Sequence, residues 1–179
     1  MKQIFRDPPV LGFAAFSGSG KTTLLTAVLP LLEAENLRVG VIKHSHHDFD
    51  IDQPGKDSYL LRKAGARQIL LASPYRTAHL REHRPPQEPR LEQLLTVMDR
   101  QDIDLILVEG FRSVEFPKLE IHRTETGKPF LHPQDPSIIA LVCNSATDAP
   151  IPRLDINSPG QVAAFITAYV ASTRTGNTA

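Results

Sequence analysis

Segment 10–35 constrains the fold of this chain more than any other part of the sequence. Residues 10–16 form an uninterrupted apolar run, which is typical of a strand buried on both faces of a parallel sheet. The run stops at the glycine-rich stretch 17–20, after which apolar residues recur at helical spacing through 21–35. A strand, a glycine-rich turn and an amphipathic helix in this order predict the first unit of an α/β domain.

Strand and helix patterns continue to alternate along the chain. The expected strands cover 38–44, 66–73, 75–82, 104–109, 118–123 and 137–142, and the expected helices 55–64, 91–98 and 158–171. Segment 118–123 alternates polar and apolar residues, so we expect it to be half exposed. The pattern predicts an α/β fold with a mainly parallel sheet flanked by helices. We expect one domain, 1–172, with small β insertions near 75–90 and 115–133, and a flexible tail at 173–179.

Composition excludes several classes of protein. Twenty Lys and Arg balance twenty Asp and Glu, so a broad cationic surface for nucleic acid is not expected. The single cysteine, Cys143, excludes an internal disulfide framework and a cysteine-based zinc cluster. No apolar run reaches the ~18 residues of a membrane span, and residues 1–9 lack the pattern of a secretory leader. We therefore expect a cytoplasmic protein without a membrane partner.

The glycine-rich stretch carries the strongest chemical signal. Gly20, Lys21 and Thr22 match the end of the Walker A pattern, while Ala15 stands where the pattern has its first glycine. Glycines allow successive backbone N–H groups to turn around a phosphate, and the helix that follows points its positive end at the same place. Lys21 can reach the β- and γ-phosphates, and the Thr22 hydroxyl can ligate Mg²⁺. We predict a P-loop NTPase-like fold whose nucleotide-binding residues are Ser17, Gly18, Ser19, Gly20, Lys21, Thr22 and Thr23.

A nucleotide triphosphate site also needs an acid near the metal. Glu109 ends the apolar run 105–108 and occupies the Walker B position. Asp104 lies at the other end of that strand, roughly 16 Å away, which favours a structural role. Glu109 is therefore the candidate for the metal and for catalysis, beside Lys21.

The loop after the second strand, 43–52, is rich in histidine and aspartate. Three interpretations stay open: a loop that meets the γ-phosphate and Mg²⁺ through Asp48 or Asp52, a transition-metal site, or a solvated acidic loop. We take Asp48 as a candidate metal contact. His44, at the strand end, is a candidate for a catalytic or water-orienting role.

Taken together, these motifs resemble the molybdopterin-guanine dinucleotide biosynthesis protein B family. The segments that carry the resemblance are 14–25, 41–48, 54–59, 62–66 and 104–111. The resemblance implies a homodimeric protein that binds GTP with Mg²⁺ and hydrolyses it weakly. It also implies a guanylyltransferase partner, which joins GMP to molybdopterin, and makes molybdopterin a further candidate ligand. The guanine preference comes only from the family, because the usual Asn-Lys-x-Asp motif is absent and 144–148 does not match its spacing.

Two other functions remain open. A small-molecule kinase would use the same phosphate loop, and so would a protein that only binds a phosphorylated ligand. No arginine occupies a recognisable position for stabilising the transferred phosphoryl group, so slow hydrolysis is expected.

Overall fold

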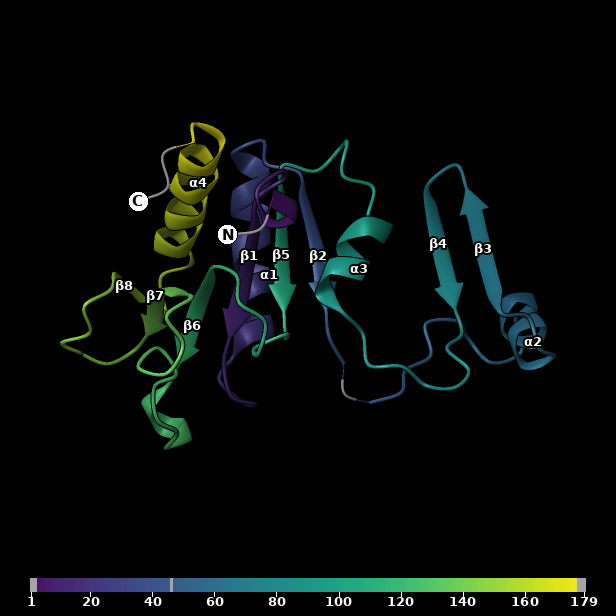
Figure 1. The fold of residues 1–179 in the computed structure, drawn as a ribbon, viewed down its shortest axis with the longest axis horizontal. Helices are drawn as coiled ribbons and strands as arrows, with labels where there is room; N and C mark the ends of the chain where they lie inside the picture. Colours follow the sequence, from purple (N-terminus) through teal and green to yellow (C-terminus); the bar gives the residue numbers. More distant parts are fainter. Residues whose placement is uncertain (1–2, 46, 177–179) are drawn as a thin grey trace. The chain divides into compact units, whose positions relative to one another are not determined.

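The computed structural model describes residues 3–45 and 47–176, and these form two compact units. Within the described residues, the larger unit comprises 3–44 and 90–176, and the smaller unit comprises 45–89. The larger unit is an α/β sheet with helices, and the smaller unit is a helix with a β-hairpin (Figure 1). None of the helices in these residues is long and apolar enough to cross a membrane.

The larger unit contains a six-stranded sheet in the order β2-β5-β1-β6-β7-β8. Its strands are β1 (Val10–Ala14), β2 (Val39–Lys43), β5 (Leu105–Glu109), β6 (Lys118–His122), β7 (Ile138–Cys143) and β8 (Arg153–Asp155). Every neighbouring pair is parallel. The predicted α/β class with a mainly parallel sheet is confirmed, although β8 was not among the predicted strands.

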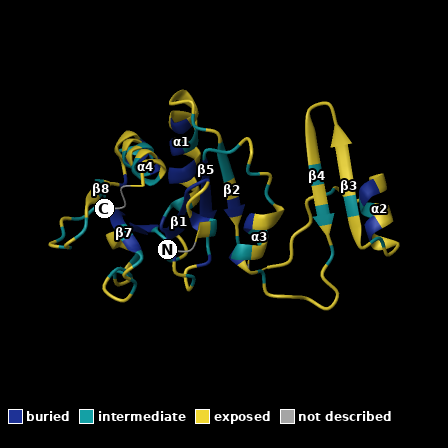
Figure 2. Ribbon diagram, turned by 45° about the horizontal axis from the view of Figure 1, so that its top comes forward, coloured by how far each residue is buried: buried dark blue, intermediate teal, exposed yellow. Residues whose placement is uncertain are grey.

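Helices cover the two faces of this sheet. Helices α1 (Lys21–Ala34) and α4 (Pro159–Arg174) pack on one face against the apolar side chains of β1, β5, β6 and β7. Helix α3 (Leu91–Val97) and the 3₁₀ turn Gln3–Phe5 pack on the other face, over β1, β2 and β5. The resulting core is dark blue along the sheet strands in Figure 2. Helix α4 continues through Arg174, into the predicted tail, whose residues 177–179 lie outside the described part.

The expectation that 118–123 is half exposed is wrong for β6, because all five residues of this strand are buried. It lies between β1 and β7, inside a segment proposed as an insertion. Its polar side chains bond to the segment 123–136, which covers them. Glu120 accepts hydrogen bonds from the backbone N–H groups of Leu131 (2.6 Å) and His132 (2.9 Å). Protein partners thus replace the water that the alternating pattern suggested.

The smaller unit holds α2 (Asp57–Lys63), β3 (Gln68–Ser73) and β4 (Arg76–Arg81). The predicted strands at 66–73 and 75–82 form, but they pair only with each other, in antiparallel register, as a two-stranded sheet. Figure 2 shows both strands coloured largely as exposed. An isolated two-stranded hairpin is marginally stable in water, so this unit needs further stabilising contacts.

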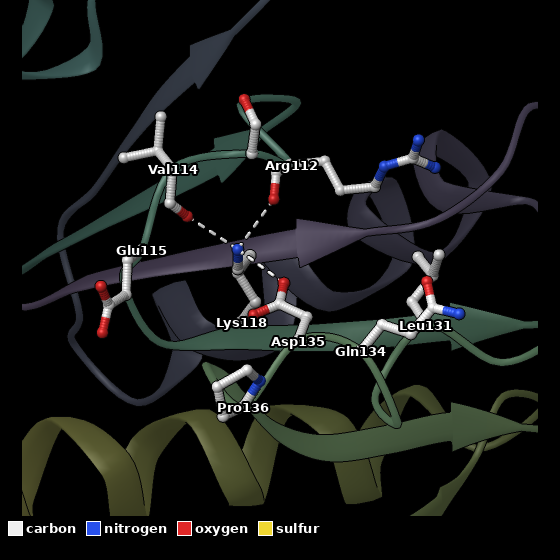
Figure 3. Close-up of a pocket in the computed structure, with 9 residues that line it drawn as sticks. Arg112, Val114, Glu115, Lys118, Leu131, Gln134, Asp135 and Pro136 are labelled. Carbon is white, nitrogen blue, oxygen red and sulfur yellow. Dashed lines mark hydrogen bonds and ion pairs between the residues drawn. The ribbon is translucent and has the colours of Figure 1, made fainter.

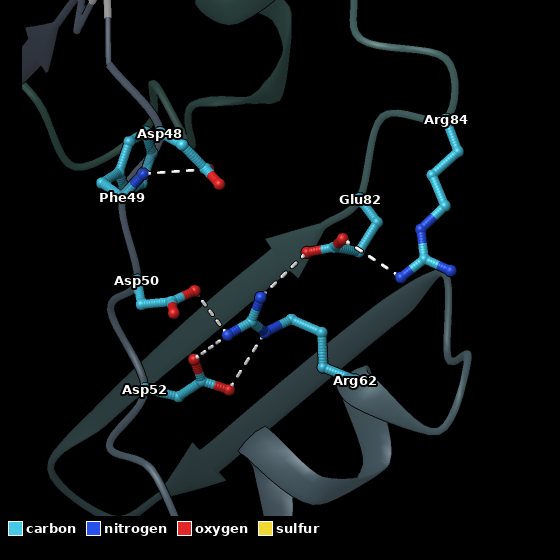
Figure 4. Close-up of polar contacts among 7 residues, drawn as sticks. All are labelled: Asp48, Phe49, Asp50, Asp52, Arg62, Glu82 and Arg84. Carbon is cyan, nitrogen blue, oxygen red and sulfur yellow. Dashed lines mark hydrogen bonds and ion pairs between the residues drawn. The ribbon is translucent and has the colours of Figure 1, made fainter.

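One such contact is a cluster of charges around Arg62 (Figure 4). The Arg62 guanidinium lies 2.7 Å from Asp52, 2.5 Å from Asp50 and 3.4 Å from Glu82. Its hydrogen bond to Asp52 lowers the pKa of that carboxyl, whose side chain is 3% exposed. The acidic loop, α2 and the end of β4 are thereby tied together. Asp52, one of two candidates for a metal contact, is thus held by an arginine.

Candidate functional site

The site is built at the carboxyl edge of the parallel sheet. Strand register pairs Phe13 of β1 and Lys43 of β2 with Glu109 of β5, so the three strands end at the same level. Parallel strands bring their following loops to one edge, where ligands of open α/β sheets bind. The loop after β1, the acid that ends β5 and the end of β2 therefore lie together.

The loop between β1 and α1 has the backbone of a phosphate cradle. Gly18 and Gly20 have φ of 79° and 84°, values that residues with a side chain rarely adopt. The Ser19 hydroxyl donates to the Phe16 carbonyl (2.9 Å) and closes the turn. A Cβ at Gly18 would meet no atom within 4 Å, so this side of the loop is open. The small residue Ala15, which stands where the Walker A pattern has its first glycine, packs against the core.

Helix α1 begins at this loop without a side-chain cap. Its N-cap is Gly20, and among the described residues there is no side-chain cap hydrogen bond at this end of the helix. The first N–H groups of a helix have no acceptor within the helix, and the helix dipole adds positive potential there. Uncapped N–H groups at the end of a glycine turn are available to an anion.

Lys21 supplies a cation at the centre of the site. Its ammonium lies 3.4 Å from the Phe16 carbonyl. Burial lowers the pKa of Lys21, and the nearby charges of Lys43 and Arg112 lower it further, while Glu109 acts in the opposite sense. Lys21, Lys43 and Arg112 bring three positive charges to this region. Glu109 brings one negative charge, so the region has an excess of positive charge. This excess favours a polyanionic ligand.

An acid and two hydroxyls that Mg²⁺ could use are present beside the loop. Glu109 is 15% exposed and forms an ion pair with Lys43, 3.4 Å away. Thr22 and Thr23 are exposed in the first turn of α1. Carboxylate, hydroxyl and phosphate oxygens are the ligands that Mg²⁺ prefers, so these residues fit the ion. In the described part of the chain, no three His, Cys, Asp or Glu side chains are grouped as a metal site.

The turn after Glu109 is tightly built around His44. A Cβ at Gly110 would lie 2.6 Å from the His44 Cβ, and Gly110 has φ of 98°. Phe111 follows with φ of 53°, an unfavourable value for a residue with a large side chain. The Phe111 ring stacks on the His44 ring at 4.6 Å between centroids. The backbone N–H of His44 donates to the Glu109 carbonyl at 2.8 Å. His44 therefore lies beside Glu109, and its catalytic role stays a prediction.

Asp104 and Asp48 are two further aspartates that the sequence singled out, one in each unit. Asp104, at the opposite end of β5, accepts from Arg38 (2.8 Å) and Arg174 (2.6 Å), and these bonds hold the pKa of its carboxyl well below its usual range. It ties β5 to β2 and α4, which is a structural role. Asp48 belongs to the smaller unit, where it accepts the Phe49 N–H at 3.0 Å. Its contact with the metal stays a prediction.

Several cations at the site were not predicted from the sequence. The Arg112 guanidinium lies 5.1 Å from the centroid of the Phe16 ring, and the Lys128 ammonium 6.0 Å from it. Arg123, at the end of β6, approaches Gly20. Arg112 could have been found from its place directly after the Glu109 strand. Arg123 could not, because its place depends on β6 being an interior strand.

Comparisons with known proteins agree on one family. The family model of molybdopterin guanine dinucleotide synthesis protein B matches residues 10–144. The molybdopterin-guanine dinucleotide biosynthesis adapter protein of Escherichia coli (strain K12) is 44% identical over 163 residues, which are 90% of this chain and 93% of the relative.

A second relative and a solved structure extend this similarity. The Haemophilus influenzae protein of the same name is 43% identical over 158 residues, covering 88% of this chain and 87% of the relative. A crystal structure of molybdopterin-guanine biosynthesis protein B superimposes with a TM-score of 0.67 at 25% identity, covering 89% of this chain and 99% of that one.

Proposed function

The chain belongs to the molybdopterin guanine dinucleotide synthesis protein B family, and from this premise we propose that it is a GTP-binding adapter in molybdenum cofactor biosynthesis. Its partner in this proposal is the cytoplasmic guanylyltransferase that joins GMP to molybdopterin. The observation that carries the proposal is the open glycine turn before α1, with Lys21 and Glu109 beside it. The adapter names of the relatives in E. coli and H. influenzae support the assignment to this pathway.

In this proposal the phosphate loop holds the triphosphate. Backbone N–H groups of 18–23 surround the phosphates, and Lys21 neutralises charge on them. Thr22 and Glu109 are the groups of this unit that would hold Mg²⁺, and the ion would supply positive charge that neutralises the phosphates. Weak hydrolysis, which the family resemblance implies, is part of this proposal, and molybdopterin is a second candidate ligand.

Calorimetry with GTP, ATP and GDP, each with and without Mg²⁺, tests the proposal. We expect Mg²⁺-dependent binding of GTP and weaker binding of ATP. In a separate chromatography experiment, we expect the purified guanylyltransferase to co-elute with the GTP-loaded protein. Turnover that one small acceptor accelerates, with no effect of the guanylyltransferase, would favour a kinase instead. Binding without any dependence on Mg²⁺ would favour a receptor for a phosphorylated ligand.

The smaller unit supports the proposed homodimer. It exposes seven large apolar side chains: Phe49, Ile51, Leu60, Leu61, Leu70, Leu71 and Tyr75. Leu70 is 68% exposed and Tyr75 90% exposed. Such a concentration of exposed apolar side chains marks an interaction surface, and a hairpin with two unpaired edges is completed when another chain adds strands to it. We propose that a second copy of this chain packs there. Strand β6 does not offer such an edge, because it lies between β1 and β7.

Replacing Leu70 by glutamate is expected to convert the dimer into monomers, because a charge would be buried at the interface. Sedimentation velocity at micromolar concentration should show a shift to a species of 19.8 kDa. Val97→Glu is the matched control, since Val97 is 66% exposed in the larger unit, and this variant should stay dimeric. A wild-type protein that sediments as a monomer, or a Leu70→Glu protein that stays dimeric, would contradict the proposed surface.

A further inference from the structure

Two arginines beside the phosphate loop, Arg112 and Arg123, have no carboxylate within ion-pair distance in the part of the chain that the structure describes. Arg38 and Arg174 of the larger unit form ion pairs with aspartates. In contrast, within 3–45 and 47–176, neither Arg112 nor Arg123 forms an ion pair through its guanidinium. The carboxylate nearest in sequence to Arg123 is Glu125, which accepts two hydrogen bonds from the Asn144 amide at 2.8 Å. Hydrogen bonds from the backbone and from Asn144 lower the pKa of Glu125, and the charge of Arg123 lowers it further without a direct ion pair. Unpaired guanidinium groups at an anion cradle are available to a ligand.

Arg112 stands on the side of the loop that carries the acid. It follows the sharp turn at Gly110 and Phe111, and its charge contributes to lowering the pKa of Lys21. Its backbone carbonyl accepts a hydrogen bond from the buried Lys118 ammonium at 3.0 Å, so the turn has a fixed anchor. The guanidinium is exposed over the Phe16 ring. Arg112 therefore extends from a fixed backbone toward the same region as Lys21.

Arg123 stands on the opposite side of β1. It directly follows β6, and its Nε lies 3.4 Å from the position that a Cβ on Gly20 would occupy. The guanidinium thus lies against the backbone at which α1 begins. Arg123 is not among the charges that shift the pKa of Lys21, whose neighbours are Glu109, Lys43 and Arg112. The two arginines approach the loop from different strands.

We propose that Arg112 and Arg123 form a two-sided clamp on the bound nucleotide, with different phosphates as their targets. This inference rests on the proposed nucleotide site. Glu109 would hold Mg²⁺, and the ion would neutralise charge on the terminal phosphates, so the terminal phosphate would lie on the side of Glu109, which is also the side of Arg112. The phosphates nearer the nucleoside then lie on the β6 side, next to Arg123. A guanidinium offers paired donors to phosphate oxygens. Arg112 thereby distinguishes a triphosphate from a diphosphate, and Arg123 binds both.

Calorimetry with a non-hydrolysable GTP analogue and with GDP, both with Mg²⁺, tests the clamp. Arg112→Ala should weaken binding of the analogue by about 10- to 100-fold and binding of GDP by less than about 3-fold, since one charge-assisted contact is lost. Arg123→Ala should weaken both by a similar factor of about 10. Arg112→Lys, which keeps the charge but not the fork, should fall between wild type and Arg112→Ala. Arg6→Ala is the matched control, because Arg6 is exposed before the amino end of β1.

The outcomes separate the clamp from the site on which it rests. Wild-type protein that binds the analogue, together with an Arg112→Ala variant that weakens the analogue and GDP equally or neither, would overturn the clamp and leave the nucleotide site standing. Wild-type protein that binds no nucleotide would overturn both. Thermal melting of each variant confirms that the fold is kept, and if Arg112→Ala fails to fold, the ratio of analogue to GDP affinity for Arg112→Lys decides.

Discussion

Replacement of Lys21 by alanine is expected to lower the affinity for Mg·GTP by about 100-fold or more, since the ammonium would contact two phosphates of the nucleotide. The side chain is half-buried at the start of α1, and Glu109 and the loop carbonyl of Phe16 are next to it. Without the ammonium, the phosphates would face the Glu109 carboxylate with less compensation. Calorimetry with Mg·GTP measures the loss directly.

The matched control is Lys63→Ala, which removes the same charge from an exposed position in the smaller unit. That variant should bind Mg·GTP as the wild type does. Both proteins should melt at the temperature of the wild type, because neither lysine forms an ion pair in the described residues. A Lys21→Ala protein that kept full Mg·GTP affinity would reject the assignment of the site.

The sequence predicted the local backbone around the candidate site. A glycine-rich turn between a buried strand and an amphipathic helix specifies its own backbone, so the turn at 17–20 between β1 and α1 is recognisable from its residues alone. Strand length placed Glu109 and Asp104 at opposite ends of β5, and Asp104 indeed bonds to Arg38 and Arg174. The family was also predicted correctly from these motifs together with 43–48.

The sequence did not reveal which polar side chains form their hydrogen bonds with other parts of the protein rather than with water. Alternation in 118–123 indicates two different environments for the two faces of a strand, but it does not say whether the polar face meets water or backbone. In β6 that face meets the loop 123–136, which supplies N–H donors to Glu120 and a carbonyl to His122. Because β6 was expected at the surface, Arg123 was not expected at the site.

The apolar residues of 66–73 predicted a strand, but they did not show which sheet this strand belongs to. The run Ile69–Leu71 predicts a strand, and β3 forms there, but Leu70 and Leu71 are exposed and β3 pairs only with β4. Which strands share a sheet depends on contacts distant in sequence, and those contacts are not encoded in a short window of residues. The same limit applies to prediction of the loop 43–52. Its Asp52 accepts a hydrogen bond from Arg62, which lies ten positions further along the chain.

Replacing Lys118 by methionine is expected to destabilise the larger unit by about 1–3 kcal/mol, the usual cost of leaving buried acceptors without a donor. The Lys118 side chain is 1% exposed, and its ammonium donates to Asp135 (2.8 Å) and to the carbonyls of Arg112 (3.0 Å) and Val114 (2.7 Å) (Figure 3). All three donors are used. Methionine keeps the length of the side chain, so the loss comes from the unpaired acceptors rather than from a cavity.

Urea unfolding followed by circular dichroism measures this loss as a lower midpoint at unchanged slope. Lys128→Met is the matched control, because Lys128 is exposed and its loss should change stability by less than about 0.5 kcal/mol. The double variant Lys118→Met with Asp135→Asn should regain part of the stability, since it no longer leaves a carboxylate unpaired. A Lys118→Met protein as stable as the wild type would show that water reaches these acceptors, and that the polar face of β6 is not sealed by the loop above it.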